Sequence, residues 1–425
     1  MISGETSVPF RRHCAVCGGT EGRRLFRQRF AQEENASFLA GYDVVVCGSC
    51  GFAFADGIPD QAWFDAYYRE LSKYEDGARG GNESPWEAEK LKTVSGALIP
   101  HLPRRDAQIV DIGCSTGRLL ACFRAAGFER VLGVDPSPAC SRLAMERFGI
   151  QVKTATFSNL DLPKGFADVL ILCGVLEHVR DLGQALDRIA YYTSTAGHVF
   201  ICVPDASRYA EAEDAPFQGF SMEHINFFSP ESLANLMATR GFTRVATDRD
   251  MLRLNHRTTE PVVYGVFCRT EGEQGRPAIA PDTRTISGLR EYIAQSQDES
   301  QMIHETIGRL VREGKPLLVW GVGTHTLHLL AESPLKDANI LAFVDGNPRY
   351  HGRRLLDRPV CSPEILRQHS EVAVLISSRA YQEEIAAEIV NSMKCANLLV
   401  RLYSLGRLTK PDLLTRKNSA DSRFC

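Results

Sequence analysis

The segment 110–120, which reads VDIGCSTGRLL, constrains the fold of this chain more than any other segment. An apolar strand runs into a turn marked by Gly113 and Gly117, and an amphipathic helix follows. A second apolar run ends on Asp135, 24 residues after Asp111. Glycine lets a backbone approach a ligand because a Cβ would collide with it, and an acid at the tip of the next strand can accept both hydroxyls of a ribose. The pattern predicts a nucleoside-binding pocket at the carboxyl edge of a parallel sheet.

The spacing of this turn differs from that of a dinucleotide-binding turn, which would read G-x-G-x-x-G. An Asp at its mouth would repel a pyrophosphate but suits a cationic ligand. The segment resembles motif I of the class I S-adenosylmethionine-dependent methyltransferases, whose usual form is close to (V/L)-D-(I/V)-G-C-G-x-G and whose ligand carries an ammonium and a sulfonium. The alternative is an ordinary strand-turn-helix in another kind of α/β domain. The residues of this region expected to bind the cofactor are Asp111, Gly113, Cys114, Gly117 and Asp135.

Length and composition restrict the class of protein. A chain of 425 residues has room for two or three domains, and 44% hydrophobic with 24% charged residues is ordinary for a soluble globular protein. A formal net charge of −3 argues against a general nucleic-acid binder. No apolar run approaches the ~20 residues that span a bilayer, and residues 1–12 lack the apolar core of a signal peptide. We therefore expect a cytoplasmic protein with no membrane or nucleic-acid partner.

Two C-x-x-C pairs near the N-terminus have the spacing of a metal site. Cys14 and Cys17 form the first pair, Cys47 and Cys50 the second, and a glycine follows each. Four thiolates close a tetrahedral Zn²⁺ shell and leave no position open for a substrate, so the expected zinc is structural. The gap between the pairs exceeds the usual 15–20 residues, but it can hold a hairpin. The alternatives are two unrelated cysteine pairs or a redox pair.

The remaining sequence predicts an α/β fold class with several domains. Alternating apolar runs and amphipathic segments predict a doubly wound sheet of the class I methyltransferase kind. A second α/β unit carries Gly321-x-Gly323 without the third glycine of the dinucleotide fingerprint, so we expect a Rossmann-like fold that lacks its own redox cofactor. The expected segments are a zinc-ribbon-like module (1–57), an aromatic linker or lid (58–84), the methyltransferase core (85–271), a linker helix with the Rossmann-like C-terminal domain (272–408) and a disordered tail (409–425).

Four further residues are candidates for the cofactor and substrate pocket. Thr156 and Phe157 follow a short third strand, at about the position where such a pocket contacts the adenine of the cofactor. The alternative is a plain loop. Tyr68 belongs to an aromatic-rich helix that either covers the cofactor or only packs its rings on the next domain. His178, in the segment VLEHV after the fourth strand, could contact substrate, or else fix the local structure of its loop.

A second constellation, Glu223-His224, lies on a loop just before a predicted helix that Ser229 caps and Pro230 opens. This places the pair at the carboxyl edge of the sheet, beside the expected methyl donor. A histidine can take a proton near neutral pH, and an adjacent carboxylate can raise its basicity. His224 is therefore the candidate base, with a purely structural histidine as the alternative.

The order of these modules is similar to that of the sugar C-methyltransferase family, over about residues 12–405. Those enzymes methylate keto-deoxysugars on a nucleoside diphosphate, commonly dTDP. The resemblance implies that the zinc module helps build the substrate site and that the C-terminal domain closes over the nucleotide. It also implies that His224, with Glu223 beside it, removes the proton next to the ketone. The family usually has a tyrosine three residues before this histidine, where this chain has Ser221.

Other functions remain open at this point. Methylation of an oxygen or nitrogen, on a sugar or another small metabolite, would use the same histidine to deprotonate a hydroxyl or amine. A zinc-ribbon nucleic-acid binder with a vestigial methyltransferase core is a different class of protein, and so is a non-catalytic scaffold. Salt-sensitive RNA binding would favour the first, and failure to bind the cofactor would favour the second.

Overall fold

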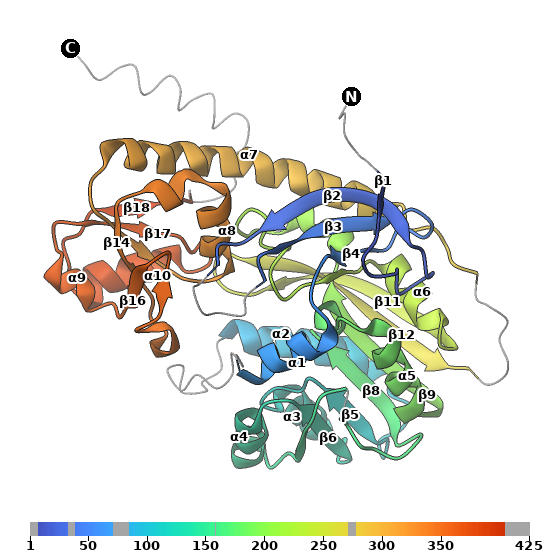
Figure 1. The fold of residues 1–425 in the computed structure, drawn as a ribbon. Helices are drawn as coiled ribbons and strands as arrows, with labels where there is room; N and C mark the ends of the chain where they lie inside the picture. Colours follow the sequence, from blue (N-terminus) through green and yellow to red (C-terminus); the bar gives the residue numbers. More distant parts are fainter. Residues whose placement is uncertain (1–6, 33–38, 71–84, 158, 271–277, 404–425) are drawn as a thin grey trace. The chain divides into compact units, whose positions relative to one another are not determined.

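The computed structural model of the protein describes residues 7–32, 39–70, 85–157, 159–270 and 278–403 (Figure 1). The expected disordered tail, 409–425, and part of the expected lid, 71–84, lie outside these residues. By its contacts the chain divides into two units, residues 1–212 with 216–297 and residues 213–215 with 298–425. The boundary falls inside a long helix, α7 (Arg284–Glu313), and the domain limits expected from the sequence stay predictions.

Seven strands form the central sheet of the first unit, in the order β11-β12-β9-β8-β5-β6-β7. The strands β5 to β9 that belong to it run parallel, whereas β12 is antiparallel to both of its neighbours. The chain proceeds outward from β5 through β6 to β7, then returns to β8 on the other side of β5, which confirms the doubly wound sheet. The strands are β5 (Ile109–Ile112), β6 (Val131–Asp135), β7 (Val152–Thr154), β8 (Ala167–Cys173), β9 (Thr193–Pro204), β11 (Phe242–Arg253) and β12 (Thr259–Arg269).

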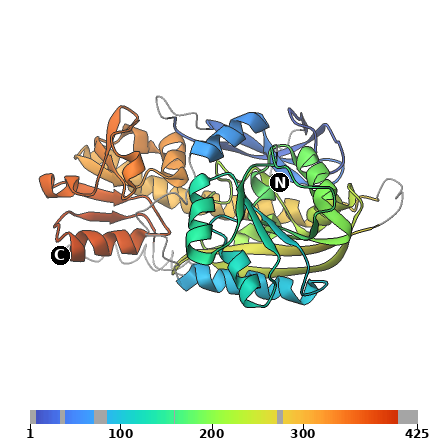
Figure 2. The same ribbon diagram turned by 90° about the horizontal axis from the view of Figure 1, so that it is seen from below.

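Helices lie on both faces of this sheet (Figures 1 and 2), because its central strands are apolar on both sides. In β8, Val169 and Ile171 pack into one hydrophobic cluster, while Leu170 and Leu172 pack into another on the opposite face. The first cluster includes side chains of α2 and α3, and the second includes those of α5 and α6. The helices are α2 (Pro85–Leu98), α3 (Arg118–Ala125), α4 (Pro138–Phe148), α5 (Leu182–Tyr192) and α6 (Pro230–Ala238).

The N-terminal module is a small antiparallel sheet, β1-β2-β3-β4-β10, whose last strand comes from the methyltransferase region. In β10, Asn226 pairs with Phe54 and Phe227 pairs with Ala53. Phe52 and Phe54 of the module also join the cluster that covers the α5 face of the large sheet. The elements are β1 (Ser7–Pro9), β2 (Glu21–Arg29), β3 (Gly41–Cys47), β4 (Ala53–Asp56) and β10 (Asn226–Phe227), with helix α1 (Gln61–Glu70) following β4.

The second unit contains a largely parallel sheet, β15-β16-β14-β13-β17-β18, which has the expected Rossmann-like character. Asp345, after β14, accepts the backbone N–H of Val322 and of Asn347, and so fixes the turn after β13. No helix among the described residues is long and apolar enough to cross a membrane. The elements are β13 (Leu317–Trp320), α8 (Thr324–Glu332), β14 (Ile340–Val344), β15 (Arg354–Leu355), β16 (Arg358–Cys361), α9 (Ile365–Gln368), β17 (Ala373–Ile376), α10 (Gln382–Ala387) and β18 (Leu399–Arg401).

Candidate active site

The turn after β5 has the backbone conformation that its glycines suggest. Gly113 and Gly117 adopt φ values of 78° and 75°, which L side chains rarely tolerate. A Cβ on Gly113 would lie 2.6 Å from Cγ2 of Val175. Ser115 adopts the same left-handed region with φ 50°, although the usual motif has glycine there. The backbone of the turn thus stays close to the strand ends, where the N–H groups of Gly113 and Cys114 both donate to the Val134 carbonyl of β6.

Two buried carboxylates, Asp111 and Asp135, lie on the adjacent strands β5 and β6 beside this turn. Asp135 accepts the backbone N–H of Ser115 on Oδ2 and that of Ser137 on Oδ1, both at 2.9 Å, so it anchors the turn that it was expected to face. Burial nevertheless raises the pKa of Asp135. Asp111 is 2% exposed, and its burial, with Cys173 and Asp135 nearby, raises its pKa well above the ordinary value. A cationic ligand would favour the ionised form of both groups.

Three other candidate cofactor residues, Cys114, Thr156 and Phe157, differ in exposure. The Cys114 side chain is buried and packs toward Gly133, where a Cβ would come within 2.5 Å of its Sγ. The backbone N–H of Ala155 donates to the carbonyl of Asp135, which brings Thr156 to the end of β6. The Thr156 N–H donates to Oδ1 of Asn159, and the half-buried Phe157 packs against the core.

Two histidines meet at the carboxyl end of β8. His178 belongs to the short 3₁₀ turn Leu176–His178, and its ring centroid lies 4.9 Å from that of His224 in an edge-to-face arrangement. Nδ1 of His178 lies 3.0 Å from the Tyr68 hydroxyl and 3.0 Å from the Glu223 carbonyl oxygen. A carbonyl only accepts hydrogen bonds, so it favours a proton on Nδ1 and leaves the lone pair of the neutral ring on Nε2.

Carboxylates and phenols surround the pair. Tyr67 donates to Oε1 of Glu223 at 3.1 Å. Glu177 is fully buried, its Oε1 lies 3.9 Å from Nε2 of His178, and its Oε2 has no hydrogen-bond partner. Burial raises the pKa of Glu177 well above the ordinary value, and burial followed by Glu223 raises that of Tyr68. The sequence patterns did not single out Tyr67 or Glu177, and the only signal for them was their place beside Tyr68 and His178.

The N-terminal module holds the loop that carries Glu223 and His224. Gln28 of β2 donates to the Phe220 carbonyl at 2.9 Å, and the Tyr42 hydroxyl of β3 donates to the Ser221 carbonyl at 2.7 Å. The Ser221 hydroxyl in turn accepts the backbone N–H groups of Glu223 and His224 at 3.3 and 3.0 Å. Ser221 therefore shapes the loop at the position where the sugar C-methyltransferases usually have a tyrosine.

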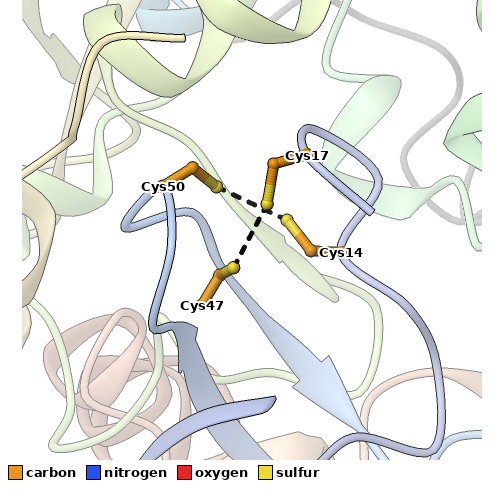
Figure 3. Close-up of side chains that lie close together, drawn as sticks. All are labelled: Cys14, Cys17, Cys47 and Cys50. Atoms are coloured by element: carbon orange, nitrogen blue, oxygen red, sulfur yellow. Dashed lines mark hydrogen bonds between the residues drawn. The ribbon is translucent and has the colours of Figure 1, made fainter. Parts of the chain in front are cut away.

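Four thiols converge in the module (Figure 3). Sγ of Cys14 lies 3.5 Å from that of Cys50, Sγ of Cys17 lies 3.4 Å from that of Cys47, and all four lie within 4.8 Å of one another. Sulfurs around a tetrahedral zinc, each about 2.3 Å from the ion, would be roughly 3.8 Å apart. The backbone N–H of Gly19 also points at Cys17 Sγ. The donor set and its geometry therefore fit a closed zinc site.

A second group of described residues could also coordinate a metal ion. Ligand atoms of Glu177, His178 and His224 all lie within 4.8 Å of one another. These three residues therefore have two possible roles, as proton-transfer groups or as a set of metal ligands, and metal analysis distinguishes them.

The comparison with known proteins identifies the region around this site. Residues 88–247 match the sequence model of a family described as methyltransferase domain. This segment is a class I S-adenosylmethionine-dependent methyltransferase domain. The matched range contains the turn after β5, both buried aspartates and the His178–His224 pair. A second family model, described as C2185-like, N-terminal, matches residues 314–397 of the C-terminal unit.

Curated relatives of the methyltransferase domain are similar over a short stretch. The ubiquinone biosynthesis O-methyltransferase of Nitrobacter winogradskyi is 35% identical over 95 residues, 21% of this chain and 36% of the relative. A tRNA U34 carboxymethyltransferase of Shewanella oneidensis is 30% identical over 105 residues, 23% of this chain and 29% of the relative. The chain thus spans about a third of the length of these relatives.

Among solved structures, the 1,6-didemethyltoxoflavin-N1-methyltransferase of Burkholderia thailandensis, bound to its substrate and S-adenosylhomocysteine, matches with a TM-score of 0.40 and 22% identity. The match covers 52% of this chain and 96% of that one.

Proposed function

We propose that this protein transfers a methyl group from S-adenosylmethionine to a carbon of a nucleotide-linked keto-deoxysugar. The observation that carries the proposal is the pairing of His178 with His224 beside Tyr68, at the carboxyl end of β8 and next to the cofactor turn. Carbon methylation requires a base near the methyl donor, and this arrangement supplies one on segments held by hydrogen bonds to His178 and to the backbone of His224.

Each residue has a defined task in this proposal. S-adenosylmethionine supplies an electrophilic methyl group when bound. Asp111 lines its pocket and stabilises its positive charge, and Asp135 accepts the ribose hydroxyls. His224 removes the proton from the carbon next to the ketone, which leaves an enolate as the nucleophile. His178, its Nδ1 proton directed to the Glu223 carbonyl, holds the His224 ring in place. Alignment of the methyl carbon with the acceptor carbon in one site is worth up to ~7–11 kcal/mol in favourable cases.

The four cysteines are proposed to hold one structural zinc ion. With all four positions of the shell filled by thiolates, the ion takes no part in the chemistry. Its role is to fold the module that contacts the 220–226 loop through Gln28 and Tyr42. The zinc thereby supports the site from outside it.

The decisive experiment offers labelled S-adenosylmethionine and a panel of nucleotide-linked keto-sugars to the purified protein in deuterium oxide. We expect a new C–CH₃ group by NMR, and deuterium next to the ketone when the donor is withheld. His224→Ala should retain cofactor binding by calorimetry and lose turnover, whereas His101→Ala, outside the site, should retain both. An unchanged rate in His224→Ala would remove this histidine from the base role.

Oxygen methylation of a small metabolite is the second candidate, favoured by the relatives that are named O-methyltransferases. His224 would then deprotonate a hydroxyl. The same NMR experiment distinguishes the two, because oxygen methylation gives an O–CH₃ group and requires no deuterium exchange at the carbon next to the ketone when the donor is withheld. Failure to bind S-adenosylmethionine would instead favour a non-catalytic scaffold.

A further inference from the structure

Asn226 lies two residues after the proposed base and is 1% exposed. Its Nδ2 donates to the backbone carbonyls of Leu176 and Val179, at 2.8 and 2.7 Å. These carbonyls flank the turn that carries His178. One side chain therefore ties together the two segments that present the histidine pair.

The orientation of this amide is fixed from the zinc module. Nη2 of Arg12 donates to Oδ1 of Asn226 at 2.6 Å. A guanidinium has donors only, so it directs Oδ1 toward itself and leaves both amide N–H atoms for the two carbonyls. A flipped amide would set its NH₂ against the guanidinium and its oxygen against two carbonyl oxygens. The amide thus has all of its main hydrogen-bonding positions filled in a single orientation.

Arg12 is itself held by the module. Its backbone N–H donates to Asp56 at 3.0 Å, and its guanidinium lies 5.0 Å from the ring centroid of Phe54. It is 5% exposed, and it precedes the zinc-ligand candidate Cys14 by two residues. The strand β4, which carries Phe54, pairs directly with β10.

Backbone hydrogen bonds of Ile225 also connect the His178 turn with the zinc module. The N–H of Ile225 donates to the Glu177 carbonyl at 2.8 Å, and the Ile225 carbonyl accepts the N–H of Ala55 at 2.9 Å. The residue that follows His224 is therefore hydrogen-bonded through its N–H to the His178 turn and through its carbonyl to the module.

From these contacts we propose that Asn226 is a positioning residue that sets the His178–His224 geometry, and that Arg12 makes this geometry depend on the folded zinc module. The proposal rests on the proposed function of the histidine pair. Neither Asn226 nor Arg12 acts on substrate. They hold two short segments, neither of which belongs to a long helix or to the large sheet, in one arrangement.

Asn226→Asp tests the proposal with almost no change in shape. The aspartate still accepts from Arg12 but places an acceptor against the carbonyls of Leu176 and Val179. We expect kcat to fall by about 100-fold, as for a displacement of ~1 Å, with the Kd for S-adenosylmethionine and the zinc content unchanged. The imidazole ¹⁵N signals of His178 and His224 should also shift in the substrate-free protein.

Asn235→Asp is the matched control. Asn235 is a buried amide of the same domain that bonds to the backbone of Ala280 instead. The Asn235→Asp substitution should lower the melting temperature without changing kcat or the imidazole signals. Equal effects of the two variants on all three readouts would overturn the proposal, because they would show only a general loss of stability.

Variants of Arg12 provide a second test if Asn226→Asp does not fold. Arg12→Met should shift the imidazole signals and lower kcat, and Arg12→Lys, which retains a charged donor, should restore most of both. Unaltered imidazole signals in Arg12→Met would overturn the coupling to the module. The NMR readout needs no substrate, so it remains decisive even if the sugar assay fails and the proposed function is wrong.

Discussion

The hydroxyl of Tyr68 lies 3.0 Å from Nδ1 of His178. This contact joins helix α1, which follows the zinc module, to the turn at the end of β8. The aromatic segment therefore contributes a side chain to the candidate site and is more than a connection between domains.

Removing this hydroxyl should slow the reaction and leave the cofactor bound. In Tyr68→Phe we expect kcat to fall about fivefold to tenfold, the value of one lost hydrogen bond, with an unchanged Kd for S-adenosylmethionine. Steady-state kinetics and calorimetry measure the two effects. Tyr191→Phe, on a side chain 45% exposed, is the control. A weaker Kd with normal kcat would place Tyr68 in the cofactor pocket instead.

Binding of the cationic cofactor should release protons from the protein. Burial raises the pKa of Asp111 well above its ordinary value, so the free protein retains this proton to a higher pH than an exposed aspartate does. A nearby cation favours the carboxylate and lowers that pKa, so affinity should rise with pH until Asp111 is ionised in the free protein.

Calorimetry in buffers of different ionisation enthalpy measures this release. Asp111→Asn should reduce the proton release and weaken binding by tenfold or more, because it removes the attraction between the Asp111 carboxylate and the bound cation. Asp168→Asn, at the other end of β8, should retain it. Wild-type binding without any proton release would contradict the assigned role of Asp111.

Metal analysis should find one zinc ion per chain. Strong chelation or Cys50→Ser should remove it and reduce amide-exchange protection in residues 41–56 and also in 223–228, because β10 pairs with β4. Cys268→Ser, outside the cluster, should keep the metal. A second ion that His224→Ala removes would show that Glu177, His178 and His224 bind a metal, and His224 would not be the base.

Gly133→Ala should destabilise the domain. Its new Cβ would lie 2.5 Å from Sγ of Cys114 and 2.8 Å from Cγ2 of Val152, and overpacking of this kind costs about 1–3 kcal/mol. Urea unfolding measures the change. Cys114→Ala in the same chain should recover part of the loss, and strict additivity of the two substitutions would show that the contact is not the cause.

The elements with strong local patterns could be predicted from the sequence. Helix α5 (Leu182–Tyr192) buries apolar residues that recur at helical spacing, and β5 (Ile109–Ile112) is the apolar strand expected before the turn at Gly113. Strand β11 has no such pattern, because it lies at the edge of the sheet and is largely exposed, so Phe242–Arg253 contains charged residues where a buried strand would be apolar. Strand β10 is too short to have any pattern of its own.

The residues of the candidate site also divide into those that have a local sequence pattern and those that do not. The cysteine pairs have a recognisable spacing, and the motifs around His178 and His224 are local, so these residues could be selected from the sequence. The contribution of Asn226 could not, because it depends on Arg12, 214 residues away. A buried amide between loops has no local signature, and only the folded chain shows which groups it bonds.

The membership of β10 in the N-terminal sheet has a consequence for engineering. A chimera that replaced residues 1–57 with the corresponding module of another protein would inherit a sheet whose last strand is encoded about 170 residues downstream of β4. Unless residues 220–228 were exchanged with it, the foreign β4 would have a mismatched partner or an open edge prone to self-association. Residues 1–57 and 220–228 therefore have to be exchanged together, although they are distant in the sequence.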